Sequence, residues 1–141
     1  MAKGFHLDIV TPDRELLSEE VVSVIAPGVE GYLGVLANHA PLVTELAVGV
    51  LRVRYLDDTE EDIAVSGGFM EVANNRVLVL ADAAERAQDI DIQRAREALI
   101  RARQMLQDPT VDHDRARKAL EQALTRLRVA GVEFPHDLEG D

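Results

Sequence analysis

The sequence predicts an all-β N-terminal domain followed by a C-terminal antiparallel α-helical hairpin, and two patterns carry this prediction. Through residues 3–82, short runs alternate apolar and polar residues, with turn signals about every 8–12 positions, as in an antiparallel β-sandwich or barrel. From residue 92 onward, apolar residues instead recur at steps of three and four, the spacing of one helix face. We therefore expect a β-sandwich domain at 1–85 and a helical hairpin at 86–141.

The strands are expected in close succession. "FHLDIV" alternates apolar and polar residues and stops before Pro12, and "VVSVIAP" and "GVLRVRYL" are rich in β-branched residues. "EDIAV", "GFMEV" and "RVLVLA" follow, so we expect about eight to ten short strands. Asn74 and Asn75 suit a two-residue hairpin turn because Asn tolerates positive φ. In "AVSGGF" we expect another hairpin turn, because Ser66 lies between strand patterns rather than at a strand–helix elbow.

Two amphipathic helices follow the strands. The predicted apolar stripes are Ile92, Ala95, Leu99, Ala102 and Leu106 on the first, and Ala116, Leu120, Ala123 and Leu127 on the second. Pro109 ends the first helix, and Asp112 or Asp114 can cap the second. Because the facing residues are largely alanine, the hairpin buries little area and should be marginally stable alone.

Charge divides the chain at the same place. The net charge is −11, and residues 1–85 hold 15 acidic against 5 basic residues. Each helix, by contrast, carries four arginines against one glutamate. The overall acidity argues against nucleic-acid binding. There is no cysteine for a disulfide or thiolate site, and no apolar run approaches the ~20 residues that span a bilayer.

The histidines and one apolar segment are the remaining candidates. The four histidines show no ligand spacing with one another, so we expect no metal site. Residues 31–46 combine apolar residues with a turn, and Tyr32, Leu33, His39 and Pro41 stand out. One interpretation is a strand, a tight turn and a core or edge histidine. The other is a partner surface, because the segment offers more apolar area than one sheet face hides.

The chain resembles the epsilon subunit family of bacterial F-type ATP synthases. "VTPDRELLSEEVVSVIAPGVEGYLGVLANHAPLV", "VSGGFMEV", "VLVLAD", "AERAQDID" and "TRLRVA" carry the resemblance in this order, over nearly all of residues 5–132. It implies a β-sandwich of about ten strands and a helical hairpin, in a non-catalytic rotor-stalk subunit that couples gamma to the c-ring of a proton-translocating ATP synthase. The implied location is peripheral, on the cytoplasmic face of the bacterial plasma membrane, without a membrane span.

The resemblance also implies regulation. In this family the hairpin folds down or extends toward the alpha and beta subunits, and the extended form inhibits ATP hydrolysis. We expect the basic second helix, with Arg115, Arg117, Arg126 and Arg128, to be attracted to acidic segments of those partners. The alternative for each arginine is an ordinary solvated helix surface. A second function class remains, a free-standing β-sandwich binding module with a helical oligomerisation tail.

No cofactor is required in this family, but some members bind ATP as a regulatory ligand through the motif I/L-D-x-x-R-A. Here the motif is residues 90–95, with Ile90, Asp91, Arg94 and Ala95 at its fixed positions. Arg101 lies two turns beyond Arg94 on nearly the same face, and Glu85 and Arg126 match further family positions. Gln122 stands where strong binders carry another arginine. The alternative is structural: Asp91 caps the helix and Arg94 folds back onto it.

Overall fold

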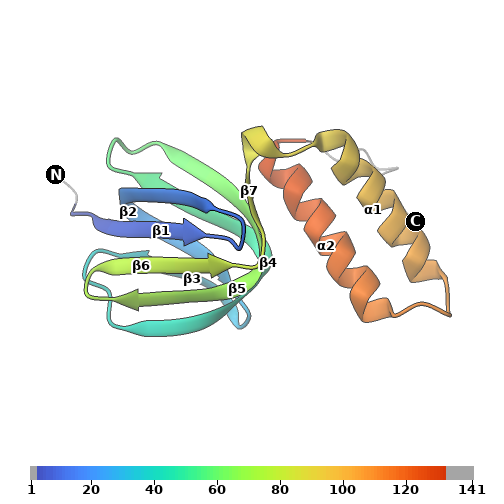
Figure 1. The fold of residues 1–141 in the computed structure, drawn as a ribbon, viewed down its shortest axis with the longest axis horizontal. Helices are drawn as coiled ribbons and strands as arrows, with labels where there is room; N and C mark the ends of the chain where they lie inside the picture. The colour runs from blue at the N-terminus through green and yellow to red at the C-terminus, as the bar shows by residue number, and fades with distance from the viewer. Residues whose placement is uncertain (1–2, 133–141) are drawn as a thin grey trace. The chain divides into compact units, whose positions relative to one another are not determined.

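The computed structural model describes residues 3–132 and divides the chain into two compact units. The sandwich unit is Met1–Ala84, and the hairpin unit is Glu85–Asp141. Figure 1 shows strands throughout the first and helices in the second, which confirms the predicted fold class. The division falls one residue before the predicted boundary.

Seven strands occur in the described residues, fewer and longer than the eight to ten short strands predicted. Their bounds are β1 Phe5–Val10, β2 Glu15–Gly28, β3 Gly31–Leu36, β4 Leu42–Tyr55, β5 Glu60–Ala73, β6 Arg76–Ala81 and β7 Ala84–Arg86. Three of them, β2, β4 and β5, are 14 residues long. Of these, β5 continues through the glycines at which the sequence suggested a break between two short strands.

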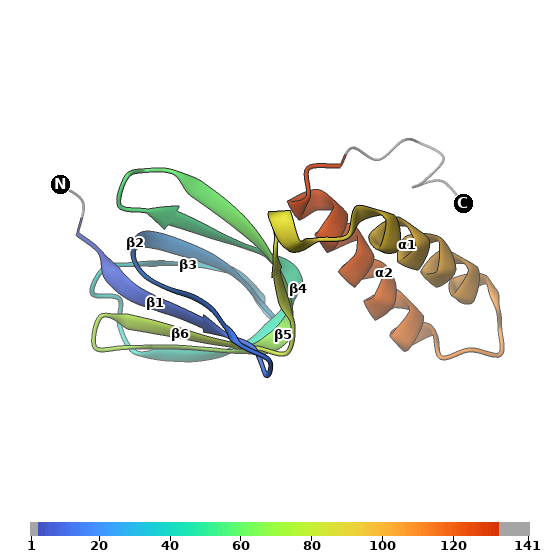
Figure 2. The ribbon, with the colours of Figure 1, turned by 45° about the horizontal axis from the view of Figure 1, so that its top comes forward.

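The strands wrap into a closed sheet (Figure 2). The order is β1-β6-β5-β4-β2-β3, and β1 also pairs with β2, which closes the ring. The pairing of β1 with β6 is parallel, whereas its pairing with β2 is antiparallel. The ring leaves β3, which pairs only with β2, as an edge strand of the described sheet.

Alternation along the strands builds the core, as the sequence predicts. In β1, Phe5, Leu7 and Ile9 are buried while the residues between them are half-buried. Side chains of this kind from six strands form one apolar cluster, in which Leu51, Ile63 and other large residues are fully buried. Because successive strand residues face opposite sides, one face of each strand supplies this core and the other meets solvent.

The expected hairpin turn at Ser66 is wrong. Residues 66–68 lie inside β5, and Ser66 and Gly68 pair with β4. Gly67 and Gly68 have positive φ, and a Cβ on Gly68 would lie 2.1 Å from the Leu80 carbonyl oxygen. The glycines therefore bend the strand against β6 without ending it. The turn at Asn74 and Asn75, both at positive φ, is confirmed.

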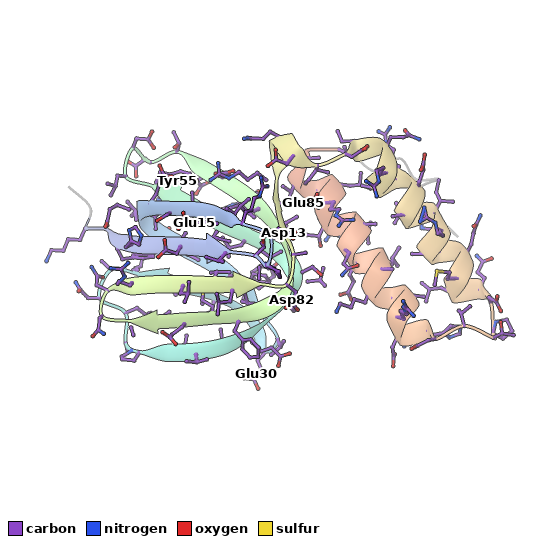
Figure 3. The ribbon with its side chains drawn as sticks, in the orientation of Figure 1. Asp13, Glu15, Glu30, Tyr55, Asp82 and Glu85 are labelled. Atoms are coloured by element: carbon purple, nitrogen blue, oxygen red, sulfur yellow. The ribbon has the colours of Figure 1, made fainter. Side chains whose placement is uncertain are left out.

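Acidic side chains are spread over the sandwich unit. Figure 3 labels Asp13, Glu15, Glu30 and Asp82 among its side chains. On β4 and β5 the charge is balanced locally, because Arg52 binds Asp62 at 2.8 Å and Arg54 binds Glu60 at 3.1 Å across the strands. These exposed pairs contribute modestly to stability.

The hairpin unit begins with a 3₁₀ turn, Ala87–Asp89, and continues with α1 (Ile92–Gln107) and α2 (His113–Val129). The Asp112 carboxylate accepts hydrogen bonds from the backbone of Asp114 and Arg115, so Asp112 caps α2. Ala95 and Leu99 of α1 pack with Ala123 and Leu127 of α2. The predicted stripes thus face each other, although Ile92 at their edge is exposed.

No helix within the described part of the chain is both long and apolar enough to cross a membrane.

Candidate functional site

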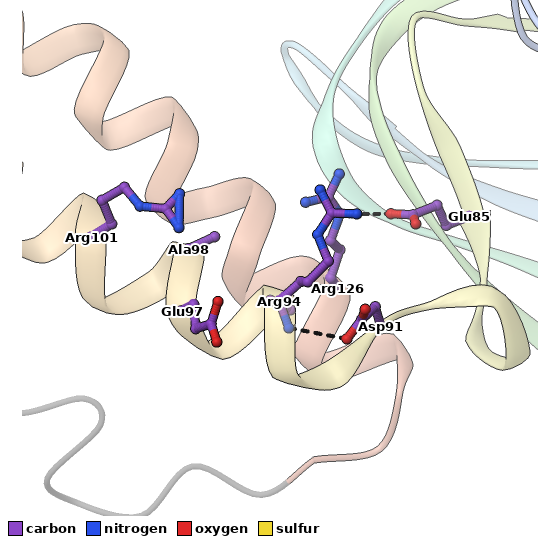
Figure 4. A pocket seen from close by; sticks show the side chains of 8 residues that line it. Glu85, Asp91, Arg94, Glu97, Ala98, Arg101 and Arg126 are labelled. Carbon is purple, nitrogen blue, oxygen red and sulfur yellow. Dashed lines mark hydrogen bonds and ion pairs between the residues drawn. The ribbon is translucent and has the colours of Figure 1, made fainter.

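A pocket lies within the hairpin unit, beside the start of α1 (Figure 4). Its volume is about 320 Å³, at the lower end for small-molecule sites. Its lining comprises Glu85, Asp91, Arg94, Ala95, Glu97, Ala98, Arg101 and Arg126. Three guanidinium groups and three carboxylates therefore share one small cavity.

Residues at the start of α1 line one side of this pocket. The Asp91 carboxylate accepts a hydrogen bond from the Arg94 backbone N–H at 3.1 Å, so Asp91 is the N-cap. The predicted capping role is confirmed. Arg94 itself is exposed, and Figure 4 shows its side chain reaching to the side of the hairpin where Arg126 and Glu85 lie. Backbone N–H groups at a helix start and a nearby guanidinium both favour an anion.

An ion pair ties the other side of the pocket together. Arg126 Nε lies 2.6 Å from Glu85 Oε1, and both side chains are partly buried. The pair links the last turn of α2 to the segment before α1, 41 residues away in sequence. Any anion that uses Arg126 must share it with Glu85 or displace Glu85.

Arg94 and Arg101 differ from Arg126 in their electrostatic partners. Within residues 3–132, neither guanidinium lies within 4.0 Å of a carboxylate oxygen, whereas Arg126 is paired. Both lie on nearly the same face of α1, since seven residues advance a helix by close to two full turns, about 700°. They are the two cations of the pocket left available to a ligand.

Six of the seven predicted nucleotide-site residues line this pocket. The exception is Ile90, which is only 8% exposed and anchors the chain just before α1 rather than facing the cavity. Sequence reasoning missed Glu97 and Ala98. Their spacing could have revealed them, because positions three and four after Arg94 share its helix face.

The predicted partner segment is a second candidate surface, on the sandwich unit. Tyr32 is 61% exposed, and its hydroxyl accepts a hydrogen bond from the Val50 backbone N–H at 3.1 Å. Gly49 makes this possible, because a Cβ there would lie 2.7 Å from the Tyr32 hydroxyl. The hydroxyl end of the side chain is therefore held against β4, while most of the side chain remains exposed.

The other three predicted partner residues differ in exposure. Pro41 is exposed, and the His39 ring, half-buried, bonds through Nδ1 to the Ala40 carbonyl oxygen at 2.7 Å. Leu33 is half-buried and packs against the core, so its main contacts are within the sandwich and not on a partner surface. Leu36, by contrast, is 64% exposed and lies four residues beyond Tyr32, on the same face of β3.

The four arginines of α2 do not form one basic face. At about 100° per residue, Arg115 and Arg126 lie on one flank of the buried stripe, and Arg117 and Arg128 lie on the other. Arg117 pairs with Asp114 at 2.6 Å, and Arg126 pairs with Glu85. Arg115 and Arg128 are exposed, and no carboxylate of the described residues lies within ion-pair distance of them.

Neither a metal centre nor a nucleophile elbow is found in residues 3–132. No three His, Cys, Asp or Glu side chains gather there around a shared point, and His136 lies outside the described residues. Ser66 lies in the middle of β5, not at a turn between a strand and a helix.

A closed β-sandwich followed by an amphipathic hairpin with an arginine-rich pocket defines a two-domain class of protein. Two family descriptions match its two parts: "ATP synthase, Delta/Epsilon chain, beta-sandwich domain" at residues 4–87 and "ATP synthase, Delta/Epsilon chain, long alpha-helix domain" at residues 88–131. The chain belongs to the ATP synthase delta/epsilon chain family.

Relatives match it over almost their whole length. The ATP synthase epsilon chain of Moorella thermoacetica is 49% identical over 92% of this chain and 98% of its own length. The ATP synthase epsilon chain of Nitratidesulfovibrio vulgaris (strain DP4) is 53% identical over 93% of this chain and 98% of its own length. Among solved structures, a chain of the Euglena gracilis mitochondrial ATP synthase (OSCP/F1/c-ring, rotational state 1) superposes with a TM-score of 0.79. It is 30% identical over 90% of this chain and 81% of that one.

Proposed function

We propose that this chain is a non-catalytic central-stalk subunit of a bacterial F-type ATP synthase. The single observation that carries the proposal is the match of both units to one family, together with relatives named ATP synthase epsilon chain that match over 98% of their own length. The matched Euglena chain comes from an F1/c-ring assembly, which supports a place beside a c-ring. The chain then acts peripherally, at the cytoplasmic face of the plasma membrane.

Co-purification from its host tests this proposal against a free-standing binding module. An affinity-tagged chain should bring down gamma together with the c-ring and the alpha and beta subunits. A chain recovered alone, or only as a homo-oligomer, would contradict it and support the module with an oligomerisation tail.

The surface around Tyr32 and Leu36 is the proposed gamma-binding site. Its support is apolar exposure on one short strand, with a tyrosine already held in place by a backbone hydrogen bond. Leu36→Asp should abolish gamma capture by the full chain, because a carboxylate would be buried against apolar surface. Leu56→Asp is the matched control, since Leu56 is 56% exposed but lies in the β4–β5 turn. Equal loss in both variants would place the interface elsewhere.

The hairpin is the proposed inhibitory element. Its small aliphatic core fits an element whose two arrangements differ by a few kcal/mol. Deleting residues 91–141 should raise ATP hydrolysis by the assembled enzyme. Arg115→Ala with Arg128→Ala should reproduce part of that rise, because neither cation has an ion-pair partner among residues 3–132. Arg117→Ala, which removes an already paired cation, should change hydrolysis less. Unchanged hydrolysis after the deletion would rule out inhibition by the hairpin.

The pocket is the proposed site for ATP as a regulatory ligand. The support is the helix start at Asp91, together with the available cations Arg94 and Arg101. Binding here would hold the arrangement of α1 against α2 that forms the pocket. At ~3 mM ATP, a Kd of about 1 mM stabilises that arrangement by only ~0.8 kcal/mol, whereas a micromolar Kd gives roughly 5 kcal/mol. The affinity therefore decides whether the site acts as a switch.

Calorimetric titration of the full chain with ATP tests this site. Arg94→Ala should weaken binding at least tenfold, because it removes a charge-assisted contact worth about 1.5–3 kcal/mol. Arg96→Ala is the matched control: an exposed arginine two residues on, which lies outside the pocket. Gln122→Arg, one turn before Arg126, should tighten binding. Absence of heat at millimolar ATP would end the proposal.

A further inference from the structure

We propose that Glu97 makes the hairpin pocket select a polyphosphate in its magnesium complex over the free anion. This inference rests on the proposed nucleotide function of the same pocket. Anion binding alone does not explain why a carboxylate lies along the helix between the two available arginines.

The position of Glu97 follows from helix geometry. With a rise of 1.5 Å per residue, Glu97 lies about 4.5 Å along the axis from Arg94 and about 6 Å from Arg101. It is also within about 60° of both around the helix, and all three side chains line the cavity (Figure 4). A phosphate chain that reaches from one arginine to the other therefore passes the Glu97 carboxylate.

The three carboxylates of the pocket have different partners. Asp91 accepts the capping hydrogen bond from the Arg94 backbone, and Glu85 holds Arg126 at 2.6 Å. Glu97 accepts a hydrogen bond from the neutral Gln93 amide at 3.2 Å, and no cation of the described residues pairs with it. Glu97 is thus the carboxylate with a full charge left to offer a ligand.

A free polyphosphate is repelled by that charge, whereas a metal-bound one is attracted. Like charges at a few ångströms oppose binding, and an intervening divalent cation reverses the sign. Mg²⁺ is commonly held by one or two carboxylates together with substrate phosphates, and it keeps several waters. Because residues 3–132 contain no ready-made group of three metal ligands, the ion must arrive on the phosphates.

The arginines and Glu97 therefore bind different parts of the ligand. Arg94 and Arg101 hold phosphate oxygens, and Glu97 holds the Mg²⁺ either as a direct ligand or through a water of the ion's coordination shell. The net charge of the six ionised groups is zero, so the pocket favours a ligand whose charge the metal has already reduced.

Calorimetric titration of the full chain with ATP and with pyrophosphate tests the inference, each in excess MgCl₂ and each in a metal chelator. The unchanged chain should bind the magnesium forms about five- to tenfold more tightly. Glu97→Gln should remove that preference by strengthening free-anion binding and weakening the magnesium form. Glu121→Gln, an exposed glutamate of α2 outside the pocket, should behave as the unchanged chain does.

The outcomes separate the two proposals. Equal affinity for both forms in the unchanged chain overturns the role of Glu97 and leaves nucleotide binding standing. That role is also overturned if Glu97→Gln strengthens free-anion binding but leaves a magnesium preference intact. If neither ligand binds in either form, the nucleotide site itself fails, and this inference fails with it.

Discussion

The sandwich unit and the hairpin unit bury apolar surface on very different scales. The sandwich core contains 18 buried residues from six strands, with Phe5, Met70 and several leucines and isoleucines among them. The hairpin cluster contains four buried residues, and two of them are alanines. Since stabilisation grows with the apolar area removed from water, the first unit is fixed in one arrangement and the second is marginal.

In the hairpin, polar contacts partly compensate for the small buried apolar area. Asp91 and Asp112 cap its two helices, and the Glu85–Arg126 pair closes its base. Each such contact is worth about 1 kcal/mol, less than one large buried side chain. The hairpin is therefore held by a few interactions that ligands and salt can change, which suits a regulatory element. The sandwich is held mainly by apolar packing, which they change much less.

The largest expected effect is in the sandwich core. Ile63→Ala should lower the free energy of unfolding of this unit by about 2–5 kcal/mol, because Ile63 is fully buried and leaves a cavity. Val43→Ala is the control, since Val43 is 66% exposed. Hydrogen exchange of sandwich peptides across a urea series measures the free energy of unfolding of both variants. A loss below about 1 kcal/mol for Ile63→Ala would mean that the core is not closely packed.

A smaller and local effect is expected from the same kind of truncation in the hairpin. Leu99→Ala should cost about 2 kcal/mol, because Leu99 is the main buried side chain of α1 and the neighbouring alanines can partly close the gap. Exchange protection should fall in α1 and α2 while the sandwich peptides stay unchanged. The exposed neighbour Ile100→Ala should leave both units protected. Equal loss in both units would show that they unfold together, in spite of their unequal cores.

Sequence patterns predicted the parts of the fold that local periodicity determines. The alternation of β1 and the stripes of α1 and α2 need only the chain's own spacing, and so does the turn at Asn74 and Asn75. The bend at Gly67 and Gly68 was wrongly predicted as a turn, because its cause is the Leu80 carbonyl on another strand. The closure through β1, paired on both sides, likewise depends on register between segments far apart in sequence.

The residues of the candidate site also differ in how far local spacing predicts their contacts. Asp91, Arg94 and Arg101 share one helix, so their common face follows from spacing, and Glu97 was equally predictable. The contact between Glu85 and Arg126 spans 41 residues, and only the family resemblance brought the two residues into one hypothesis. Even so, the resemblance did not indicate that they would pair with each other.

Removing a helix cap of the hairpin should destabilise it less than truncating its core. Asp112→Ala should destabilise α2 by about 1 kcal/mol, since the backbone N–H groups of Asp114 and Arg115 lose their acceptor. Asp114→Ala removes only an exposed ion pair with Arg117 and should cost a few tenths of a kcal/mol, about the value of an i,i+3 pair. Exchange rates of amides in the first turn of α2 compare the two. Equal rates would mean that Asp112 does not cap the helix in solution.

The smallest expected effect is a pH dependence in the sandwich. A hydrogen bond from Ser18, with His6 and Arg76 close by, holds the pKa of the Asp8 carboxyl below its ordinary value. Because the folded-state pKa is the lower one, Asp8 stabilises the sandwich above the unfolded pKa of about 3.9, and this contribution is lost as pH falls through the folded pKa.

Asp8→Asn should therefore flatten the fall in sandwich stability below about pH 4 and cost on the order of 0.5 kcal/mol at neutral pH, where a partly exposed ion pair contributes little. Asp57 provides the comparison, because hydrogen bonds from the Thr59 hydroxyl and backbone N–H also lower the pKa of its carboxyl, but within a single exposed turn. Its replacement by Asn should change the acid limb less, since the Asp57 contacts survive without the rest of the fold. Urea midpoints measured from about pH 2 to 7 for the two variants decide between these outcomes, and identical slopes would show that Asp8 is not a stabilising charge of the closed sheet.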